Sequence, residues 1–221
     1  MKTFKELQEG VYDPNIFKAI FLAGGPGSGK SYVTKKITGG LGLKIVNSDP
    51  HFEKLIKGAG LSLNMPDAEF DSREPLRLRA KSVRDKRKDN WVEGRLGIII
   101  DGTGKDADDL ISQSNGLLEL GYDTYMIFVN TSVDVALKRN AERSRSVPTP
   151  IVVNAWKAVQ NNIGQFSQHF TGGRFVAVDN NDVSEDELAK VQKIIRRLVK
   201  KKVTNTRATN WMAMELAKRK R

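Results

Sequence analysis

The stretch Gly24-Gly25-Pro26-Gly27-Ser28-Gly29-Lys30-Ser31 matches G-x-x-x-x-G-K-[ST], a pattern typical of loops that bind a phosphate chain. The apolar run at residues 18–23 predicts a short buried strand before it, and residues 31–38 predict a helix after it. Strand, glycine-rich turn and helix in this order favour a P-loop over a flexible glycine loop with a chance lysine. The fold is therefore expected to be built around a strand that ends in a phosphate-binding turn.

This P-loop predicts how a nucleotide is held. Its glycines let the backbone approach phosphate closely, with the N–H groups pointing inward, and the following helix adds the positive end of its dipole. The Lys30 side chain can reach the β- and γ-phosphates, and the Ser31 hydroxyl can ligate Mg²⁺. ATP and Mg²⁺ are the expected cofactors. The residues expected around the phosphates are Gly24, Gly25, Pro26, Gly27, Ser28, Gly29, Lys30 and Ser31.

Four further apolar segments predict strands, and segments with helical character lie between them. Five strands that alternate with helices predict an α/β fold of the P-loop NTPase, nucleotide-kinase-like class, with a parallel five-stranded sheet and helices on both faces. The additional strands are expected at residues 43–47, within 96–104, at 124–129 and at 174–178. Helices are expected at residues 52–57, 73–93, 106–120, 132–143 and 151–166, and after a capping box that begins at Ser184.

The composition excludes several kinds of site and indicates a cellular compartment. The 221 residues include no cysteine, which excludes disulfides, thiolate metal sites and cysteine nucleophiles. No apolar run is long enough to cross a membrane, and the first residues lack the apolar core of a signal peptide. We expect a cytoplasmic protein without membrane contact, and the sequence leaves its oligomeric state open.

The net charge of +11 is concentrated at the C-terminal end. Residues 193–221 hold 11 Lys and Arg and one acid, whereas residues 1–192 carry a net charge of only +1. Such a basic end can bind DNA or RNA through phosphate contacts, and it can equally be a solvated helix end with a loose terminus. A second basic region, residues 73–95, has a net charge of +5.

Two aspartates follow predicted strands and are expected to meet the P-loop, because ligands gather at the carboxyl ends of parallel strands. Asp49 ends the second strand and is the candidate general base, although an aspartate there also suits a helix cap. Asp101 follows an aliphatic run, as the Walker B carboxylate does, and can hold Mg²⁺ through water or orient the substrate hydroxyl. A turn aspartate at a strand end is the alternative for Asp101.

Three arginines, Arg139, Arg143 and Arg145, lie on and just beyond the helix that follows the fourth strand. Arg139 and Arg143 share a face at i and i+4. In a kinase, a mobile basic segment closes over ATP and stabilises the transferred charge, and these arginines are candidates for that role. The alternative is a solvated helix end that is favourable to the helix dipole.

Taken together, the P-loop, Ser48-Asp49, the segment IIIDGTG at 98–104 and the segment RNAERSRSVP at 139–148 resemble the zeta-toxin and polynucleotide-kinase group of P-loop kinases. The chain is most similar to the small versions found in bacteriophages. The resemblance implies ATP-dependent phosphorylation of a hydroxyl on a polynucleotide end, a hydroxymethylated DNA base or a sugar nucleotide. It also implies that Asp49 is the base, that Asp101 is the acid of the [DE]-G-T turn, and that the arginines belong to a lid.

One departure from that group concerns the acceptor. Related kinases often place an arginine within a few residues of the base, and Pro50-His51-Phe52-Glu53 contains none. The resemblance therefore transfers the ATP side of the site and leaves the acceptor open. The expected organisation is an N-terminal arm at 1–15, a kinase domain at 16–202 and a basic tail at 203–221. Within the domain we expect a substrate-side insertion at about 51–95 and a lid at about 139–150.

Three functions follow as hypotheses. The first is a kinase that phosphorylates a hydroxyl of a nucleic acid or nucleotide. The second is a kinase of a small sugar nucleotide, as in zeta toxins. The third, from a different class, is an ATP-dependent nucleic-acid-binding protein with little transferase activity. Transfer of label from ATP to an acceptor separates the first two from the third.

Overall fold

The computed structural model describes residues 10–143 and 147–219, in which five strands form one parallel sheet with the order β2-β3-β1-β4-β5. The P-loop strand β1 lies in the centre, between β3 and β4, so the loop at its end has a strand end on either side. The strands are β1 (Lys18–Ala23), β2 (Lys44–Val46), β3 (Ile98–Asp101), β4 (Asp123–Asn130) and β5 (Phe175–Asp179). The expected parallel α/β fold is confirmed.

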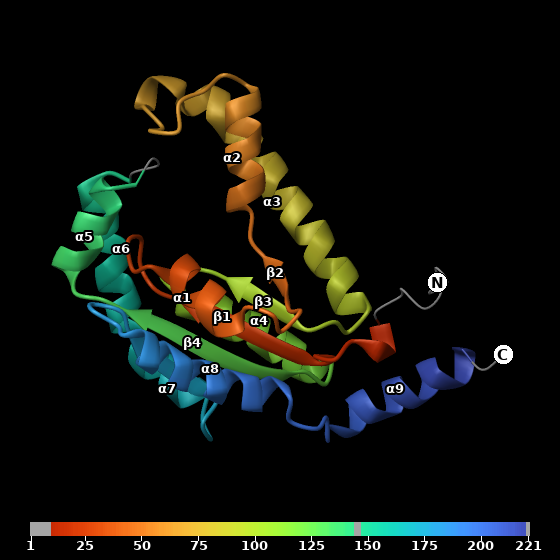
Figure 1. The fold of residues 1–221 in the computed structure, drawn as a ribbon. Coiled ribbons are helices and arrows are strands. Elements are labelled where there is room, and N and C mark those ends of the chain that lie inside the picture. The colour runs from red at the N-terminus through yellow and green to blue at the C-terminus, as the bar shows by residue number, and fades with distance from the viewer. Residues whose placement is uncertain (1–9, 144–146, 220–221) are drawn as a thin grey trace.

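Helices cover both faces of the sheet (Figure 1). They are α1 (Lys30–Thr38), α2 (Asp49–Gly58), α3 (Phe70–Glu93), α4 (Ala107–Glu119), α5 (Val133–Ala141), α6 (Thr149–Asn161), α7 (Ile163–His169), α8 (Glu185–Val199) and α9 (Thr206–Arg219). Two 3₁₀ turns, η1 (Gly10–Tyr12) and η2 (Asp67–Glu69), precede β1 and α3. The capping box at Ser184 is present, with Glu187 as its partner.

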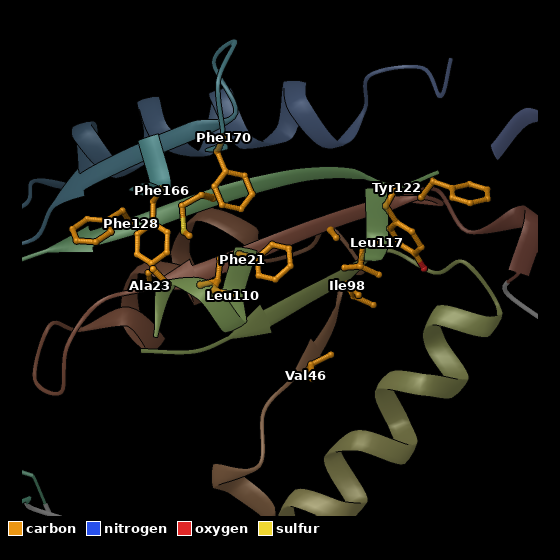
Figure 2. Packing of buried hydrophobic residues seen from close by; sticks show 14 of the residues in the cluster. Phe21, Ala23, Val46, Ile98, Leu110, Leu117, Tyr122, Phe128, Phe166 and Phe170 are labelled. Carbon is orange, nitrogen blue, oxygen red and sulfur yellow. The ribbon is translucent and has the colours of Figure 1, made fainter. Parts of the chain in front are cut away.

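The two faces of the sheet bury two separate apolar clusters, because successive side chains of a strand point to opposite faces. In β1, Phe21 packs on the face that α4 and α7 cover, whereas Ile20 and Leu22 pack on the face of α1 and α8. Figure 2 shows Phe166 of α7 and the adjacent Phe170 against the first of these faces, beside Phe21 and Phe128. Burial on both faces explains why the central strands are continuous apolar runs.

The helices α2 and α3 pack on each other and project from the β2 side of the sheet (Figure 1). They enclose a third small apolar cluster around Phe52, Ile56 and Ala80. The helix α3 begins at Phe70 and not at Arg73 as expected, so Pro75 lies inside it. Pro75 is the sixth residue of α3, beyond the first turn, so the Asp71 carbonyl lacks the usual hydrogen bond from an N–H four residues later.

Two further helices predicted from the sequence need correction. The single helix expected at 151–166 is two helices, α6 and α7, that meet at Asn162. There the Asn162 amide donates hydrogen bonds to the carbonyls of Gly104 and Lys105, which lie in the loop after β3. The helix expected at 52–57 begins earlier, at Asp49, with Ser48 as its cap residue. Asp49 is therefore in the first turn of α2 and is not the cap.

The helix α9 lies at the amino ends of the strands, far from the P-loop (Figure 1). Its Trp211 ring packs edge-on against Phe17, the residue before β1, and Ala208 is fully buried against the turn at Gly121 before β4. The P-loop follows the opposite end of β1, about 20 Å away for six residues of strand. Among the described residues, no helix has the length and apolarity needed to cross a membrane.

Candidate active site

The P-loop backbone forms a turn that only glycine accommodates at two positions. Gly24 has a φ of 152°, and a Cβ there would lie 2.6 Å from the carbonyl oxygen of Val129. Gly27 has a φ of 78°, and a Cβ there would overlap the backbone carbonyl of Ala136 in α5. The loop is thus packed directly against β4 and α5, and its conformation requires glycine.

The P-loop also contains polar groups that suit a phosphate ligand. The Ser28 hydroxyl is buried and has no hydrogen-bond partner among the described residues. The Lys30 ammonium donates to the carbonyls of Gly24 (2.5 Å) and Gly25 (3.4 Å). Burial lowers the pKa of Lys30, and the positive charge of Arg143 lowers it further, against the opposite effect of Asp101 and Asp49. A phosphate would supply negative charge and hydrogen-bond acceptors to these groups.

The carboxyl ends of β2 and β3 bring two acidic side chains to the P-loop. Asp49, Asp101, Lys30 and Ser31 all line one cavity of about 460 Å³. The same cavity is lined by Gly102 and Thr103 from the turn after β3, and by Arg139 and Arg143. The structure therefore brings together the P-loop, both aspartates and two of the three arginines that the sequence suggested.

The chemical environment of Asp101 differs from that of an exposed carboxylate. Burial raises its pKa, and the negative charge of Asp49 raises it further. The positive charge of Lys30 and a hydrogen bond from Asn47 act in the opposite direction. Asn47 Nδ2 donates to Asp101 Oδ2 at 2.7 Å, and Asn47 Oδ1 accepts from the backbone N–H of Asp49 at 2.7 Å. Asn47 therefore links the two acidic residues to one another.

Arg139 and Arg143 occupy different positions in the cavity. The Arg139 guanidinium donates to the carbonyls of Asn180 (2.6 Å) and Asn181 (3.1 Å), in the loop after β5. Arg143 is exposed beyond the end of α5, and its guanidinium forms no hydrogen bond or ion pair with residues 10–143 and 147–219. Its positive charge nevertheless acts on Lys30. The third candidate, Arg145, lies outside the described residues.

Two side chains that the sequence analysis missed hold the P-loop and the lid segment in place. Asn180 is buried, and its Nδ2 donates to the Ser28 carbonyl at 2.7 Å. Asn140, also buried, pairs through its side-chain amide with the backbone of Val147, at 2.8 and 3.0 Å. Asn47 and Asn180 each directly follow a strand, so a search for polar residues at strand ends would have found them.

The polar groups that line the cavity fit the two ligands predicted from the sequence, a nucleotide phosphate chain and Mg²⁺. The orphaned Ser28 hydroxyl, the glycine cradle and the desolvated Lys30 fit a nucleotide phosphate chain. The Ser31 hydroxyl and the Asp101 carboxylate line the same cavity and offer the oxygen ligands that Mg²⁺ prefers. In the described part of the chain, no cluster of three or more acidic or histidine side chains forms a metal cage. Mg²⁺ with few protein ligands and several phosphate ligands is the usual arrangement in such sites.

A second cavity, of about 620 Å³, adjoins the first and shares Asp101, Gly102 and Thr103 with it. One wall is α3, which contributes three cations at i, i+3 and i+7, namely Lys81, Arg84 and Lys88. The opposite wall is the start of α4, with Asp106 and Asp109. The Arg84 guanidinium pairs with the neighbouring Asp85, and Lys88 contacts Gln113 of α4 at 3.4 Å.

Comparisons with known proteins agree with this architecture. A curated cytidylate kinase from Ignicoccus hospitalis is 36% identical over 85 residues, which are 35% of this chain and 47% of that kinase. The chain thus spans about half the length of the curated relative it matches.

Two solved structures are similar in fold. One is a proposed kinase from Chloroflexus aurantiacus J-10-fl, with a TM-score of 0.56, 16% identity and coverage of 83% of this chain and 97% of that one. The other is the AvrRxo1-ORF1:AvrRxo1-ORF2 complex with sulphate ions, with a TM-score of 0.56, 14% identity and coverage of 91% and 73%. At these identities the likeness concerns the fold alone.

The family itself is shown by the sequence. The zeta toxin family profile matches residues 6–187, a span that includes the P-loop, both aspartates, the three arginines and the whole parallel sheet. The chain therefore belongs to the zeta toxin family, a family of P-loop kinases.

Proposed function

We propose that this protein transfers the γ-phosphoryl group of ATP to a hydroxyl group of a nucleic acid or nucleotide. One observation carries the proposal: a cavity lined by the P-loop and a second cavity lined by cations meet at Asp101, Gly102 and Thr103. The first cavity suits the phosphates of ATP. The second cavity begins where the phosphoryl group is transferred and is the proposed site of the acceptor. Family membership supports a kinase reaction.

On the donor side, the P-loop amides and Lys30 bind the β- and γ-phosphates. Lys30 exchanges its contacts with the Gly24 and Gly25 carbonyls for phosphate oxygens. Ser31 and Asp101 are the residues that would hold Mg²⁺, which neutralises charge on the phosphates when bound. Arg143, at the mouth of the cavity, is placed to stabilise negative charge on the moving phosphoryl group.

On the acceptor side, Asp49 is the proposed general base. The acceptor hydroxyl oxygen forms a bond to the γ-phosphorus, the bond from that phosphorus to the β–γ bridging oxygen breaks, and ADP leaves with the bridging oxygen. The hydroxyl proton passes to the Asp49 carboxylate. Asp49 suits this role better than Asp101, because it is exposed at the mouth of the cavity whereas Asp101 is partly buried and held by Asn47.

The wall of the second cavity supports an acceptor that bears phosphate. Lys81, Arg84 and Lys88 lie on one face of α3, as their spacing of three and four residues requires. Lys81 has no ion-pair partner in the described ranges 10–143 and 147–219. Such a row can bind the phosphates of a nucleotide or a polynucleotide end while its hydroxyl lies near Asp49.

The test is a screen for label transfer from ATP labelled at the γ-phosphate. Acceptors are oligonucleotides with a free 5′-hydroxyl, DNA with hydroxymethylated bases, and nucleotides. We expect one class to be labelled by the wild-type protein and none by Lys30→Ala or Asp49→Asn. Failure to label any of these acceptors would contradict the proposal.

A second candidate is a small sugar nucleotide as acceptor. The volume of the second cavity, about 620 Å³, lies within the range of roughly 300–1,000 Å³ that is usual for small-molecule sites. The carboxylates of Asp106 and Asp109 offer acceptors for sugar hydroxyls. This candidate predicts that expression in bacteria is toxic and that Lys30→Ala relieves the toxicity. An active enzyme that cells tolerate well argues against it.

The Asp49→Asn variant also separates both kinases from an ATP-dependent nucleic-acid-binding protein with little transferase activity. A kinase loses phosphoryl transfer in this variant and keeps ATP binding. A binding protein keeps its function, because no proton has to be removed from an acceptor.

A further inference from the structure

From Lys190 onward, the outer face of α8 and the turn after it form a basic surface. We define the α8 basic surface by seven exposed side chains: Lys190, Lys193, Arg196, Arg197, Lys200, Lys201 and Lys202. Between residues 190 and 207 the sequence contains no acidic residue. None of the seven forms an ion pair within the described part of the chain.

The arrangement of these cations follows from how α8 packs. Leu188, Ile195 and Val199 are buried against the sheet, on the face that α1 also covers. With 100° per residue, Lys190, Lys193, Arg197 and Lys200 fall on the opposite face, in one row. An open hollow lies at the end of this row, lined by Arg197, Leu198, Lys200 and Lys201.

The row matches the dimensions of a nucleic acid backbone. Ten residues of helix separate Lys190 from Lys200, which is about 15 Å at 1.5 Å per residue. Phosphates on one strand of a duplex are spaced by about 3.4 Å along the axis, so the row spans roughly four of them. A concentrated field of one sign attracts a polyanion. The exposed carboxylates of Asp186 and Glu187 flank the row only at its amino end, in the first turn of α8 before Lys190.

A nucleic acid suits this surface better than an anionic membrane. Helices that lie on membranes combine lysine and arginine with aromatic or large aliphatic side chains that insert between lipids. Among the described residues of α8, Ile194 is the one exposed large hydrophobic residue, at 38% exposure. The other large apolar side chains of the helix pack toward the sheet.

We propose that the α8 basic surface binds the phosphate backbone of nucleic acid, independently of sequence and away from the active site. The α8 surface lies on one face of the sheet, while the two cavities open at its carboxyl edge, so the two regions contact different parts of a long polymer. This binding goes beyond the proposed function, since it needs neither ATP nor an acceptor hydroxyl.

The test measures binding without catalysis. The probe is a fluorescent DNA duplex of about two helical turns, with unmodified bases and phosphates on both 5′ ends, so that it offers neither the 5′-hydroxyl nor the hydroxymethylated base proposed as acceptors. Fluorescence anisotropy without ATP gives the affinity at about 50 and 200 mM salt. We expect the wild-type affinity to fall roughly 100-fold across this range, as about four phosphate contacts require.

The test variant combines Lys193→Gln, Arg197→Gln and Lys200→Gln, because glutamine keeps helix propensity and removes charge. We expect about ten-fold weaker binding at low salt, and a slope of log affinity against log salt reduced by roughly 2.7. The matched control is Arg79→Gln, Lys86→Gln and Lys157→Gln, three exposed cations that line neither cavity. The control, and the charge-retaining pair Lys193→Arg and Lys200→Arg, should bind as the wild type does.

The inference is overturned if the wild-type protein does not bind the duplex, or if the test and control variants lose affinity equally. Binding to vesicles that contain phosphatidylserine, without binding to the duplex, also overturns it. The proposed function fails separately, when no acceptor is labelled. Weaker duplex binding by the test variant, with or without kinase activity, supports the α8 surface.

Discussion

Asn47 donates a 2.7 Å hydrogen bond to Asp101, and this contact joins the carboxyl ends of β2 and β3 beside the P-loop. The same side chain accepts from the N–H of Asp49, so one amide positions both acidic residues of the site. Its two hydrogen bonds explain how the exposed start of α2 is held close to the partly buried Asp101. Asn47 is thus a positioning residue in the proposed reaction.

Replacement of Asn47 by alanine should change the pH dependence of the kinase. The hydrogen bond lowers the pKa of Asp101, so its loss raises a pKa that burial already raises. If ionised Asp101 is needed to hold Mg²⁺, a larger fraction of the enzyme is protonated and inactive at low pH. We expect the acid limb of the kcat/KM profile to move to higher pH. Asn154→Ala, at an exposed position of α6, is the control, and an unchanged acid limb in Asn47→Ala would contradict the assignment.

The two described lid arginines should differ in their kinetic effects. Arg139 is bonded to the carbonyls of Asn180 and Asn181 and lies beside Gly29, so it shapes the nucleotide side of the cavity. Arg143 is exposed, and its charge acts on Lys30. Arg139→Ala should mainly raise the KM for ATP, whereas Arg143→Ala should lower kcat by about 100-fold or more. Steady-state kinetics check this split, and a reversal of the two effects would exchange the roles.

Substitution at two glycines separates backbone strain from loss of space. Gly27 and Gly40 have φ values of 78° and 76°, so alanine at either position incurs a similar strain of about 1–2 kcal/mol. A Cβ at Gly27 would overlap Ala136, whereas a Cβ at Gly40 meets nothing within 4 Å. Gly27→Ala should abolish ATP binding, measured by calorimetry, and Gly40→Ala should keep it. Equal losses in both variants would show that strain alone is responsible.

The ion pair between Lys18 and Asp123 should stabilise the fold without contributing to activity. Lys18 is 1% exposed at the amino end of β1, and its ammonium contacts the Asp123 carboxylate at the start of β4. Asp123→Ala leaves a buried charge without its partner and should cost about 3 kcal/mol in the free energy of unfolding. Lys18→Met removes the charge itself and should cost less.

Urea unfolding of both Lys18 and Asp123 variants measures this difference, and the KM for ATP should stay unchanged, because the pair lies at the opposite end of the sheet from the P-loop. A greater loss of stability in Lys18→Met than in Asp123→Ala would argue against an uncompensated charge as the cause.

The sequence by itself determined the P-loop, the five strands, the parallel α/β class and the strand-end positions of Asp49 and Asp101. These features depend on local sequence spacing. A strand buried on both faces can be recognised in the sequence because it must be a continuous apolar run. The P-loop is likewise specified by glycines within a few residues of one another. The single helix expected at 151–166 was wrong, because the break at Asn162 depends on a contact with the loop at Gly104, which local periodicity does not encode.

Only the tertiary structure decided which distant residues meet. The contact between Asn47 and Asp101 spans 54 residues, and the bonds from Arg139 to the loop after β5 depend on the strand order β2-β3-β1-β4-β5. In the sequence the basic C-terminal end is one continuous region, whereas in the fold its residues lie on two separate helices, α8 and α9. The row on α8 faces outward because Leu188 and Ile195 face the sheet, while α9 is fixed at the amino ends of the strands by Ala208 and Trp211. Burial of apolar side chains in a closed core is the physical reason, since it fixes where each helix lies and which of its faces meets solvent.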